Sequence, residues 1–452
     1  MVTRKLATFA AELDYKDLPT PVAAMGKRLL LDGLGCLLAG TAGWPGASAA
    51  RMVLELGGNP QATMFAGNAR TSVTNAAFAN GITLYSVGLN DFLQKASAHP
   101  GASVIPTILA VGEWRNCQGA DLLAAMAAGY EVIDRVARSI MPSHRERGFH
   151  PTGTCGTFGA TAAAGRLLGF DAEQIACAFG IAGSQAAGLY EYINDGTSTI
   201  MFHAGRAAKN GIEAALLTKA GLTGPATVLE GDRGFFRATA DSTDSATALA
   251  GLGERYAFLE TTFRPYFGCT STIAASGATA RIVKRRGGFR FEEIEGVKVI
   301  CNPVVVRDNA ETNPQTLLAA RLSMAYNVAL VMARGDVLVR DLEESDLRDE
   351  KMRRFMPLVS MTGDNEMPRF GCTVEVTYKS GEVDTEPMPY WRGDSSHSLS
   401  WDEVVRKFES LVGDLVSAEH KEKLAHIVEN IERFDGRTLA EALSKGLKST
   451  LS

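Results

Sequence analysis

The chain has 452 residues and a formal net charge of −5, and 46% of its residues are apolar and 21% are charged. This balance is typical of a soluble globular protein. The acidic net charge argues against non-specific nucleic-acid binding, which needs a basic surface. The most apolar stretch, residues 28–43, is interrupted by Asp32 and by glycines and is too short to span a bilayer.

The N-terminus and the cysteines together predict a cytoplasmic protein. Residues 1–18 contain acids and lack the apolar core of a cleavable secretory signal. The seven cysteines are scattered and form no C-x-x-C pair. This distribution favours reduced thiols over a disulfide framework or a zinc site.

The first half of the chain predicts helices. Apolar residues recur at helical spacing, and glycine usually follows the last apolar position of a segment. The segments with this pattern are residues 21–40, 72–87, 120–140, 171–188 and 205–221.

Residues 149–170 also predict a helix, which contains Gly153, Gly156 and Gly159 three positions apart. Residues at this spacing lie on one side of a helix. Because glycine is a poor helix former, we expect this face to let another helix approach closely.

The pattern changes after Tyr256. Residues 291–306 and 370–390 are rich in β-branched residues and alternate as strands do, with a hairpin turn expected at 378–383. Helices are expected between and after these strands, at residues 316–335, 401–415 and 417–434.

These segments predict a mainly α protein with an α+β insertion. A large helical domain would comprise residues 1–256 together with residues 393–452. A smaller α+β domain, residues 257–392, would act as a lid.

Common cofactor and nucleophile motifs are missing from the sequence. It has no G-x-S-x-G elbow and no Walker A loop, and the glycine spacing of GTCGTFG is wrong for a dinucleotide loop. The seven histidines include no H-x-x-x-H pair with a neighbouring acid. We therefore expect neither an organic cofactor nor a metal.

Two histidines occupy the same kind of position. His99 stands directly before Pro100, and His150 directly before Pro151, each at the start of an alanine-rich apolar helix. A single histidine there would more often be a loop residue bonded to the backbone. Two in this setting favour acid–base chemistry, because helix N-termini attract anions and a neutral imidazole can act as base or donor.

Three basic residues lie close together further along the chain than His150. His203, Arg206 and Lys209 are close in sequence, and positions 206 and 209 share a helical face. They form either a solvated surface or a clamp for carboxylates, which suits the fork of an arginine.

Two further positions lie in the α+β region. Arg264 stands directly before a proline and near Tyr266, and Tyr326 lies in an apolar helix, where its hydroxyl would need a partner.

Several stretches together carry a family resemblance that covers almost the full length. They are ANGITLYSVGLNDF, HPGASVIPTILAVGE, GFHPTGTCGTFGATAAAGRLLG, LYEYINDGTSTIMFHAGRAAKNG, FRPYFGC and LSMAYNVAL. With these landmarks in this order the chain resembles the MmgE/PrpD superfamily, which includes 2-methylcitrate dehydratase, cis-aconitate decarboxylase and iminodisuccinate epimerase. The resemblance implies a helical domain built from both chain ends, a lid domain with the site between them, a homodimer, no metal or organic cofactor, and small di- or tricarboxylate substrates.

The resemblance also implies roles for individual residues. His99 and His150 match two site histidines of the family, and Tyr326 matches the tyrosine of the lid helix. We expect His150 to act as base or acid with His99 as its partner, Tyr326 to relay a proton, and Asp91 to tune a histidine. The residues expected to bind carboxylates are Arg264, Arg206, His203, Lys209 and Tyr266.

Other positions depart from the family pattern. In the loop that typically reads DFDDT only Asp91 survives, with Gly88 and Phe92 in place of the first aspartate and the threonine. Ile200 and Arg264 stand where the family has lysines. Arginine effectively cannot release a proton, and the side chain of isoleucine has none to release. We therefore expect a substrate other than the usual 2-methylcitrate. A less charged substrate is one option.

Three functions remain open at this point. A lyase would eliminate water, carbon dioxide or ammonia beside a carboxylate. An epimerase would return the proton to the opposite face of a small dicarboxylate such as iminodisuccinate, and a non-catalytic dimeric scaffold would only bind a carboxylate. Cys155 and Cys269 are expected to be small buried residues, and Glu191 and Asp195 to form a turn and a cap.

Overall fold

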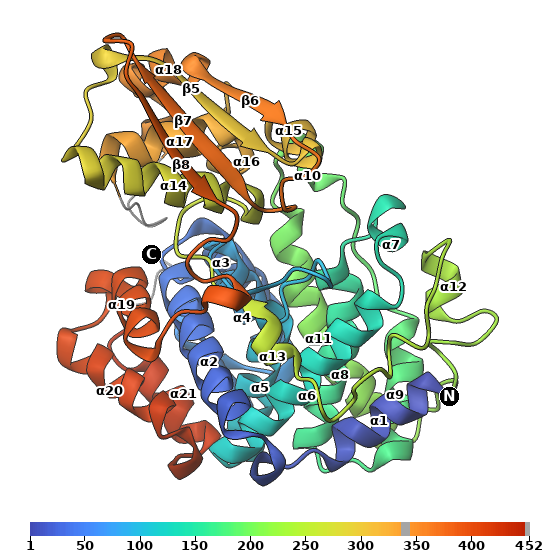
Figure 1. The fold of residues 1–452 in the computed structure, drawn as a ribbon. Helices are drawn as coiled ribbons and strands as arrows, with labels where there is room; N and C mark the ends of the chain where they lie inside the picture. The colour runs from blue at the N-terminus through green and yellow to red at the C-terminus, as the bar shows by residue number, and fades with distance from the viewer. Residues whose placement is uncertain (336–343, 448–452) are drawn as a thin grey trace. The chain divides into compact units, whose positions relative to one another are not determined.

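The computed structural model describes residues 1–335 and 344–447, and the chain forms two compact units. Unit 1 comprises Met1–Ile193, Ser198–Thr262 and the chain from Trp401 onward, and unit 2 comprises Asn194–Thr197 and Phe263–Ser400. The protein is mostly helical, with its largest sheet in unit 2 (Figure 1). This confirms the prediction of a mainly α protein with a sheet-containing C-terminal region. The action of that region as a lid stays a prediction.

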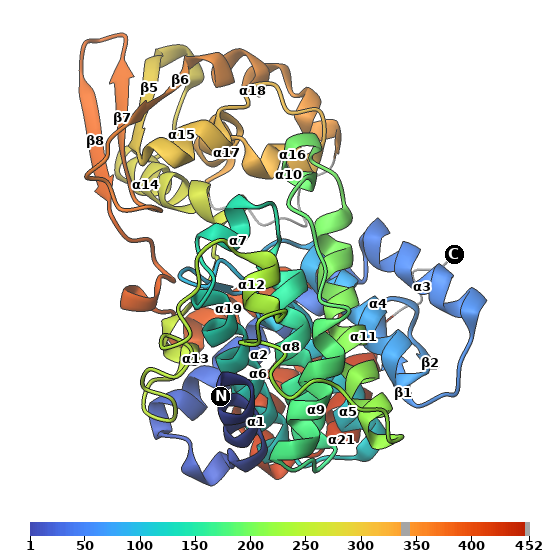
Figure 2. The ribbon, with the colours of Figure 1, turned by 90° about the vertical axis from the view of Figure 1, so that its right-hand side faces the viewer.

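Unit 1 is built from long helices around α8 (Pro151–Leu167). α8 packs against α5 (Gly101–Arg115), α6 (Gly119–Arg138), α9 (Ala172–Gly183) and α11 (Thr199–Lys219), as Figures 1 and 2 show. Almost every residue of α8 is buried, which suits its small and apolar sequence. The remaining helices of the unit with eight or more residues are α1 (Val2–Glu12), α2 (Thr20–Gly40), α3 (Trp44–Leu56), α4 (Val73–Ser86), α19 (Trp401–Val412), α20 (Ala418–Glu429) and α21 (Gly436–Ser444).

Glycines on α8 allow the close packing that the sequence predicts. A Cβ atom on Gly156 would lie 3.0 Å from Ser103 Oγ of α5, and one on Gly159 would lie 2.6 Å from the carbonyl oxygen of Gly129 in α6. A larger residue at either position would push a neighbouring helix away. The prediction of a close helix approach on this face is therefore confirmed.

One predicted helix is in fact two. The sequence predicts a continuous helix over residues 316–335, but α16 (Leu317–Leu322) ends before Ser323 and α17 (Met324–Arg334) begins after it. Ser323 leaves the helical backbone with φ −78° and ψ 115°, which are extended values, and its hydroxyl accepts the backbone N–H of Tyr326 at 3.0 Å. Serine caps helices in this way, so the prediction was wrong at this position.

Unit 2 contains a four-stranded sheet in the order β6-β5-β7-β8. β5 (Ile294–Cys301) runs parallel to β6 (Val359–Gly363) and antiparallel to β7 (Cys372–Tyr378), which pairs with β8 (Val383–Met388). α14 (Thr270–Arg286) packs against β7, β8 and α17. α14 and β6 have no counterpart among the predicted elements.

The two predicted strand regions are partly correct. The hairpin between β7 and β8 is confirmed, with the N–H of Gly381 donating to the carbonyl of Tyr378 at 2.8 Å. The strand expected to reach residue 306 instead ends at Cys301, because Pro303 starts the helix α15 (Pro303–Asn309).

Two contacts fix the segment that precedes α5. β3 (Phe92–Leu93) pairs with β4 (Thr261–Thr262) in an antiparallel ribbon. Lys407 of α19 donates to the carbonyl of Leu89 at 2.8 Å and forms an ion pair of 2.5 Å with the buried Asp32. The C-terminal return of the chain therefore helps to hold the loop that carries His99.

Candidate active site

His99 is held by the backbone of Asp91. The Nδ1 atom of His99 lies 2.7 Å from the carbonyl oxygen of Asp91. Because a carbonyl oxygen only accepts, the ring donates from Nδ1, and Nε2 is the basic nitrogen of the neutral imidazole. The carboxylate of Asp91 instead accepts the N–H of Gly101, the first residue of α5, at 3.1 and 3.2 Å. Asp91 therefore holds the ring through its main chain and stabilises a helix N-terminus through its side chain.

His150 and His203 form a buried imidazole pair. His150 directly precedes α8, His203 lies near the start of α11, and their Nδ1 atoms are 3.0 Å apart. The residues are only 2% and 7% exposed. Burial lowers the pKa of His203 to about 4, and burial together with His203 lowers the pKa of His150 well below its usual value. Both rings are consequently neutral near pH 7.

His99 belongs to the same cluster as His150. The backbone N–H of His99 donates at 3.1 Å to the hydroxyl of Thr152, which lies in the first turn of α8. After burial and His203, the charge of His99 is the next cause that lowers the pKa of His150. The helices α5 and α8 pack against each other. Each therefore carries at its N-terminus an imidazole of one cluster.

Three tyrosines surround the imidazoles. The rings of Tyr190 and Tyr192 both stand edge-on to His150 with centroid distances of 5.4 Å, and Tyr85 stands edge-on to His99 at 5.2 Å. Burial, with smaller effects of Tyr190 and Tyr85, raises the pKa of Tyr192 well above its usual value. Tyr192 is therefore a neutral phenol in this cluster.

Two arginines are candidates for binding an anion in unit 1. The guanidinium of Arg145 lies over the ring of Tyr190 at 4.9 Å, and its charge contributes to the low pKa of His150. Arg206 lies on α11, one turn after His203, and is half-buried. It makes no hydrogen bond or ion pair with any residue that the structure describes.

Lys209 is placed differently from Arg206. Its ammonium donates to Asn75 Oδ1 at 3.0 Å and lies 3.8 Å from a carboxylate oxygen of Glu213. These contacts within unit 1 already satisfy the lysine, so Arg206 is the better candidate of the two for binding a substrate carboxylate.

Three predicted site residues lie in unit 2. Arg264 is buried, and the half-buried Tyr266 lies beside Gly277 of α14. The hydroxyl of Tyr326 is buried and has no hydrogen-bond partner among the residues that the structure describes, and burial raises its pKa to about 12. The structure thus brings His99, His150 and His203 together within unit 1, while the roles of these three unit 2 residues stay predictions.

The burial of individual side chains tests the predictions for the two cysteines. Cys155 is fully buried, and burial raises the pKa of its thiol to about 12, as expected for a packing residue. Cys269 is only half-buried, which corrects the prediction of a buried residue, and its sulfur accepts the amide N–H of Asn309 at 3.3 Å. Glu191 is exposed, and the side chain of Asp195 lies outside the described part of the structure.

The tyrosines and Arg145 were not identified from the sequence. Tyr190 and Tyr192 alternate in the stretch YEY just before a glycine turn, and this pattern could have marked them as a pair. Tyr85 lies within one of the family landmarks, whereas no pattern around Arg145 distinguishes it from a surface residue.

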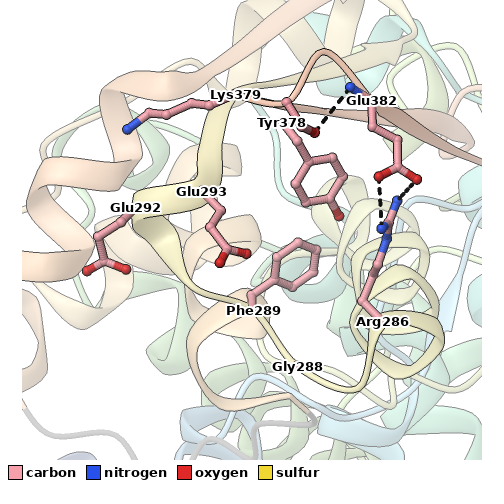
Figure 3. A pocket seen from close by; sticks show the side chains of 9 residues that line it. Arg286, Gly288, Phe289, Glu292, Glu293, Tyr378, Lys379 and Glu382 are labelled. Carbon is pink, nitrogen blue, oxygen red and sulfur yellow. Dashed lines mark hydrogen bonds and ion pairs between the residues drawn. The ribbon is translucent and has the colours of Figure 1, made fainter.

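A hollow of about 520 Å³ lies in unit 2 (Figure 3). Its lining includes Phe289 and Tyr378, whose rings are parallel with centroids 6.1 Å apart. Arg286 lies over the ring of Tyr378 at 4.6 Å and donates to the carboxylate of Glu382 at 2.7 Å. Because these charged groups already pair with each other, we place the candidate active site at the imidazole cluster.

Across residues 1–335 and 344–447, no group of three or more histidine, cysteine, aspartate or glutamate side chains is arranged to hold a metal ion. None of the helices in the same part of the chain is both long and apolar enough to cross a bilayer.

Comparison with known proteins defines the class to which this fold and cluster belong. The MmgE/PrpD N-terminal domain matches residues 4–247, and the MmgE/PrpD C-terminal domain matches residues 268–433. The chain therefore belongs to the MmgE/PrpD family, as its landmarks predict.

Individual relatives have similar full-length sequences. Cis-aconitate decarboxylase of Homo sapiens is 28% identical, over 98% of this chain and 95% of that protein. The cis-aconitate decarboxylase-like protein oryM of Aspergillus oryzae is 24% identical, over 95% of this chain and 94% of that protein. A cis-aconitate decarboxylase of Aspergillus terreus is 23% identical, over 100% of this chain and 97% of that protein.

Proposed function

We propose that this protein is a lyase of the decarboxylase or dehydratase type that acts on a small di- or tricarboxylate without a cofactor. In this proposal His150 exchanges a proton with the carbon next to a carboxylate, and His99 acts as its acid–base partner. The observation that supports it best is the cluster of imidazoles at the starts of α5 and α8, in which His150 is buried and its pKa is lowered well below the usual value.

The cluster has the properties that such a reaction needs. A buried imidazole that is neutral near pH 7 can accept a proton from carbon or return one to it. The starts of α5 and α8 carry partial positive charge, and Arg145 and Arg206 add full charges within unit 1. Positive charge placed in this way stabilises a carboxylate substrate and the enolate-like charge that develops beside it.

The relatives and the departures from the family pattern narrow the proposal. The curated relatives described above carry the names of decarboxylases, which are lyases. Ile200 and Arg264 nevertheless cannot supply the proton transfer of a lysine. We therefore propose a substrate other than 2-methylcitrate, one whose turnover depends on imidazoles and phenols rather than on lysines.

The proposal is tested with a panel of small polycarboxylates that includes cis-aconitate, 2-methylcitrate and smaller saturated and unsaturated dicarboxylates. Proton NMR of the reaction mixture would report loss of carbon dioxide or water. We expect turnover of one member, and a loss of roughly 10²–10⁴-fold in the His150→Ala variant, which is the usual contribution of a placed acid or base. His426→Ala is the matched control, because His426 is exposed on α20 and should leave the rate unchanged.

The same panel separates the alternatives. Exchange of the hydrogen beside a carboxylate without loss of a group would instead indicate an epimerase. A ligand-induced rise in melting temperature with no turnover would indicate a binding scaffold. Turnover that is unchanged in His150→Ala would contradict the assigned chemistry. The expected homodimer is a separate prediction, which gel filtration with light scattering would check.

A further inference from the structure

We infer that His203 is a positioning residue for His150, because its Nδ1 engages the Nδ1 of His150 and leaves Nε2 as the nitrogen through which His150 exchanges protons. This inference rests on the proposed function, since it assigns a role to the neighbour of the proposed acid–base group. His203 would then contribute through the ring of His150 rather than by contact with a substrate carboxylate.

The packing around His203 fixes its ring in place. A Cβ atom on Gly153 would lie 3.1 Å from the Cβ of His203, and a Cβ on Gly188 would lie 3.4 Å from its Cγ and Nδ1. The ring therefore occupies a slot that two glycines leave open. The backbone N–H of His150 donates to the carbonyl of Gly188 at 3.0 Å, so the same loop residue also anchors the partner histidine.

The distance between the rings restricts their protonation. A hydrogen bond between two ring nitrogens needs one N–H and one lone pair, so a single proton lies between the Nδ1 atoms of His150 and His203. When His150 donates this proton, its Nε2 carries a lone pair and can act as a base. When His203 donates it, the Nε2 of His150 carries the proton and can only donate.

A second proton between the two Nδ1 atoms is unfavourable. If both Nδ1 atoms carried hydrogen, two N–H groups would face each other across 3.0 Å. Burial of both rings acts in the same direction, since it lowers the pKa of each imidazole. The pair should therefore hold one proton between its two Nδ1 atoms, and His203 should select which tautomer His150 presents.

Two substitutions of His203 separate this role from simple packing. In His203→Asn the carboxamide can still accept or donate a hydrogen bond near the position of Nδ1, although it does not titrate. In His203→Leu the volume is filled and the hydrogen bond is lost. We expect kcat to fall about 10- to 100-fold in His203→Leu, as for other orienting partners of histidines, with KM little changed, and to recover most of this loss in His203→Asn.

A spectroscopic readout tests the inference without any substrate. The ¹⁵N shifts of the His150 ring, assigned by their loss in His150→Asn, should show one dominant tautomer in the wild type and in His203→Asn. In His203→Leu they should move toward the average of two tautomers. Unchanged His150 shifts and unchanged kcat in His203→Leu would overturn the inference.

The two proposals fail in different ways. If His150→Ala keeps full turnover, the proposed function fails, whereas the ¹⁵N spectra still report on the pair. If His150→Ala loses turnover but His203→Leu behaves like the wild type in both assays, only the inference fails. Circular dichroism would confirm folding of each variant, and His203→Phe, which keeps a ring without nitrogens, replaces His203→Leu should the latter not fold.

Discussion

His144 is a buried imidazole that the proposed chemistry does not use, and it should make stability depend on pH. Its Nδ1 donates to the carbonyl of Thr239 at 3.2 Å, and its Nε2 accepts the hydroxyl of Thr154 at 2.8 Å. The ring of Phe149 stacks on it with a centroid distance of 4.9 Å. Burial lowers the pKa of His144 to about 4. We predict that His144→Gln removes one source of acid destabilisation.

The magnitude follows from the two pKa values of this group. The pKa of His144 falls from 6.5, its ordinary value, to about 4 in the folded protein, so the unfolded chain binds the proton more tightly. The stability that comes from the neutral ring is complete above about pH 6.5 and is lost as the pH falls toward 4. Linkage gives a loss of about 2.5 kcal/mol between about pH 7.5 and about pH 4.5.

The variant should show the opposite order of stability at the two pH values. Glutamine does not titrate, and it should cost about 1 kcal/mol at both pH values through a weakened hydrogen bond. His144→Gln should therefore be about 1 kcal/mol less stable than the wild type near pH 7.5 and about 1.5 kcal/mol more stable near pH 4.5.

Urea unfolding followed by circular dichroism, on both chains at both pH values, measures this difference. Comparing the two chains cancels the effect of groups that titrate in both, such as Glu131 and Glu260. Burial raises the pKa of Glu131 to about 7. Burial also raises the pKa of Glu260, but its arginine partners outweigh this effect and lower the pKa to about 2. A difference between the two chains that does not change with pH would refute the reasoning.

Three further substitutions test other parts of the structure. Tyr326→Phe removes a buried hydroxyl, so we expect urea unfolding to show an unchanged free energy of unfolding or a gain of up to about 1 kcal/mol. If the phenol relays a proton, kcat should fall roughly 10²-fold. An unchanged kcat would remove Tyr326 from the mechanism. Asp91→Asn weakens the bonds to Gly101 at the start of α5 and should lower the free energy of unfolding by about 1 kcal/mol; an undiminished stability would contradict the capping role. Lys407→Met removes the cation that pairs with the buried Asp32 and should cost about 3–5 kcal/mol, which a melting temperature equal to that of the wild type would contradict.

The local patterns of the sequence predict much of the helical part of the fold. The repeat of apolar residues predicts α2, α4, α6 and α8 within a few residues of their bounds, because each buries a continuous apolar face. The glycines of α8 predict its close packing for the same local reason.

Elements that depend on distant partners were not predicted. β6 is short and pairs in parallel with β5, about 60 residues earlier in the chain, so no local turn marks it. α11 begins at Thr199, before the expected start at residue 205, because the tertiary packing of its first turns outweighs the weak helix preference of Thr199 and Ile200. The break at Ser323 depends on one hydroxyl bond to the backbone.

The candidate site shows the same division between local and long-range information. The matching positions of His99 and His150 before helix starts are visible in the sequence, and the structure places both in one cluster. The contact of His150 with His203 joins residues 53 positions apart, so the sequence gives no indication of which histidine has which neighbour. Asp91 likewise reaches His99 through a carbonyl group, which no residue type reveals.

The most direct test of the central claim is solvent deuterium incorporation during turnover of the best substrate from the panel. We predict that wild-type protein exchanges the hydrogen on the carbon beside a carboxylate with D₂O, and that His150→Ala slows this exchange as much as it slows turnover. If the reaction is a decarboxylation, product without solvent deuterium at that carbon would contradict the assigned chemistry. For either type of lyase, exchange at the wild-type rate in His150→Ala would contradict it.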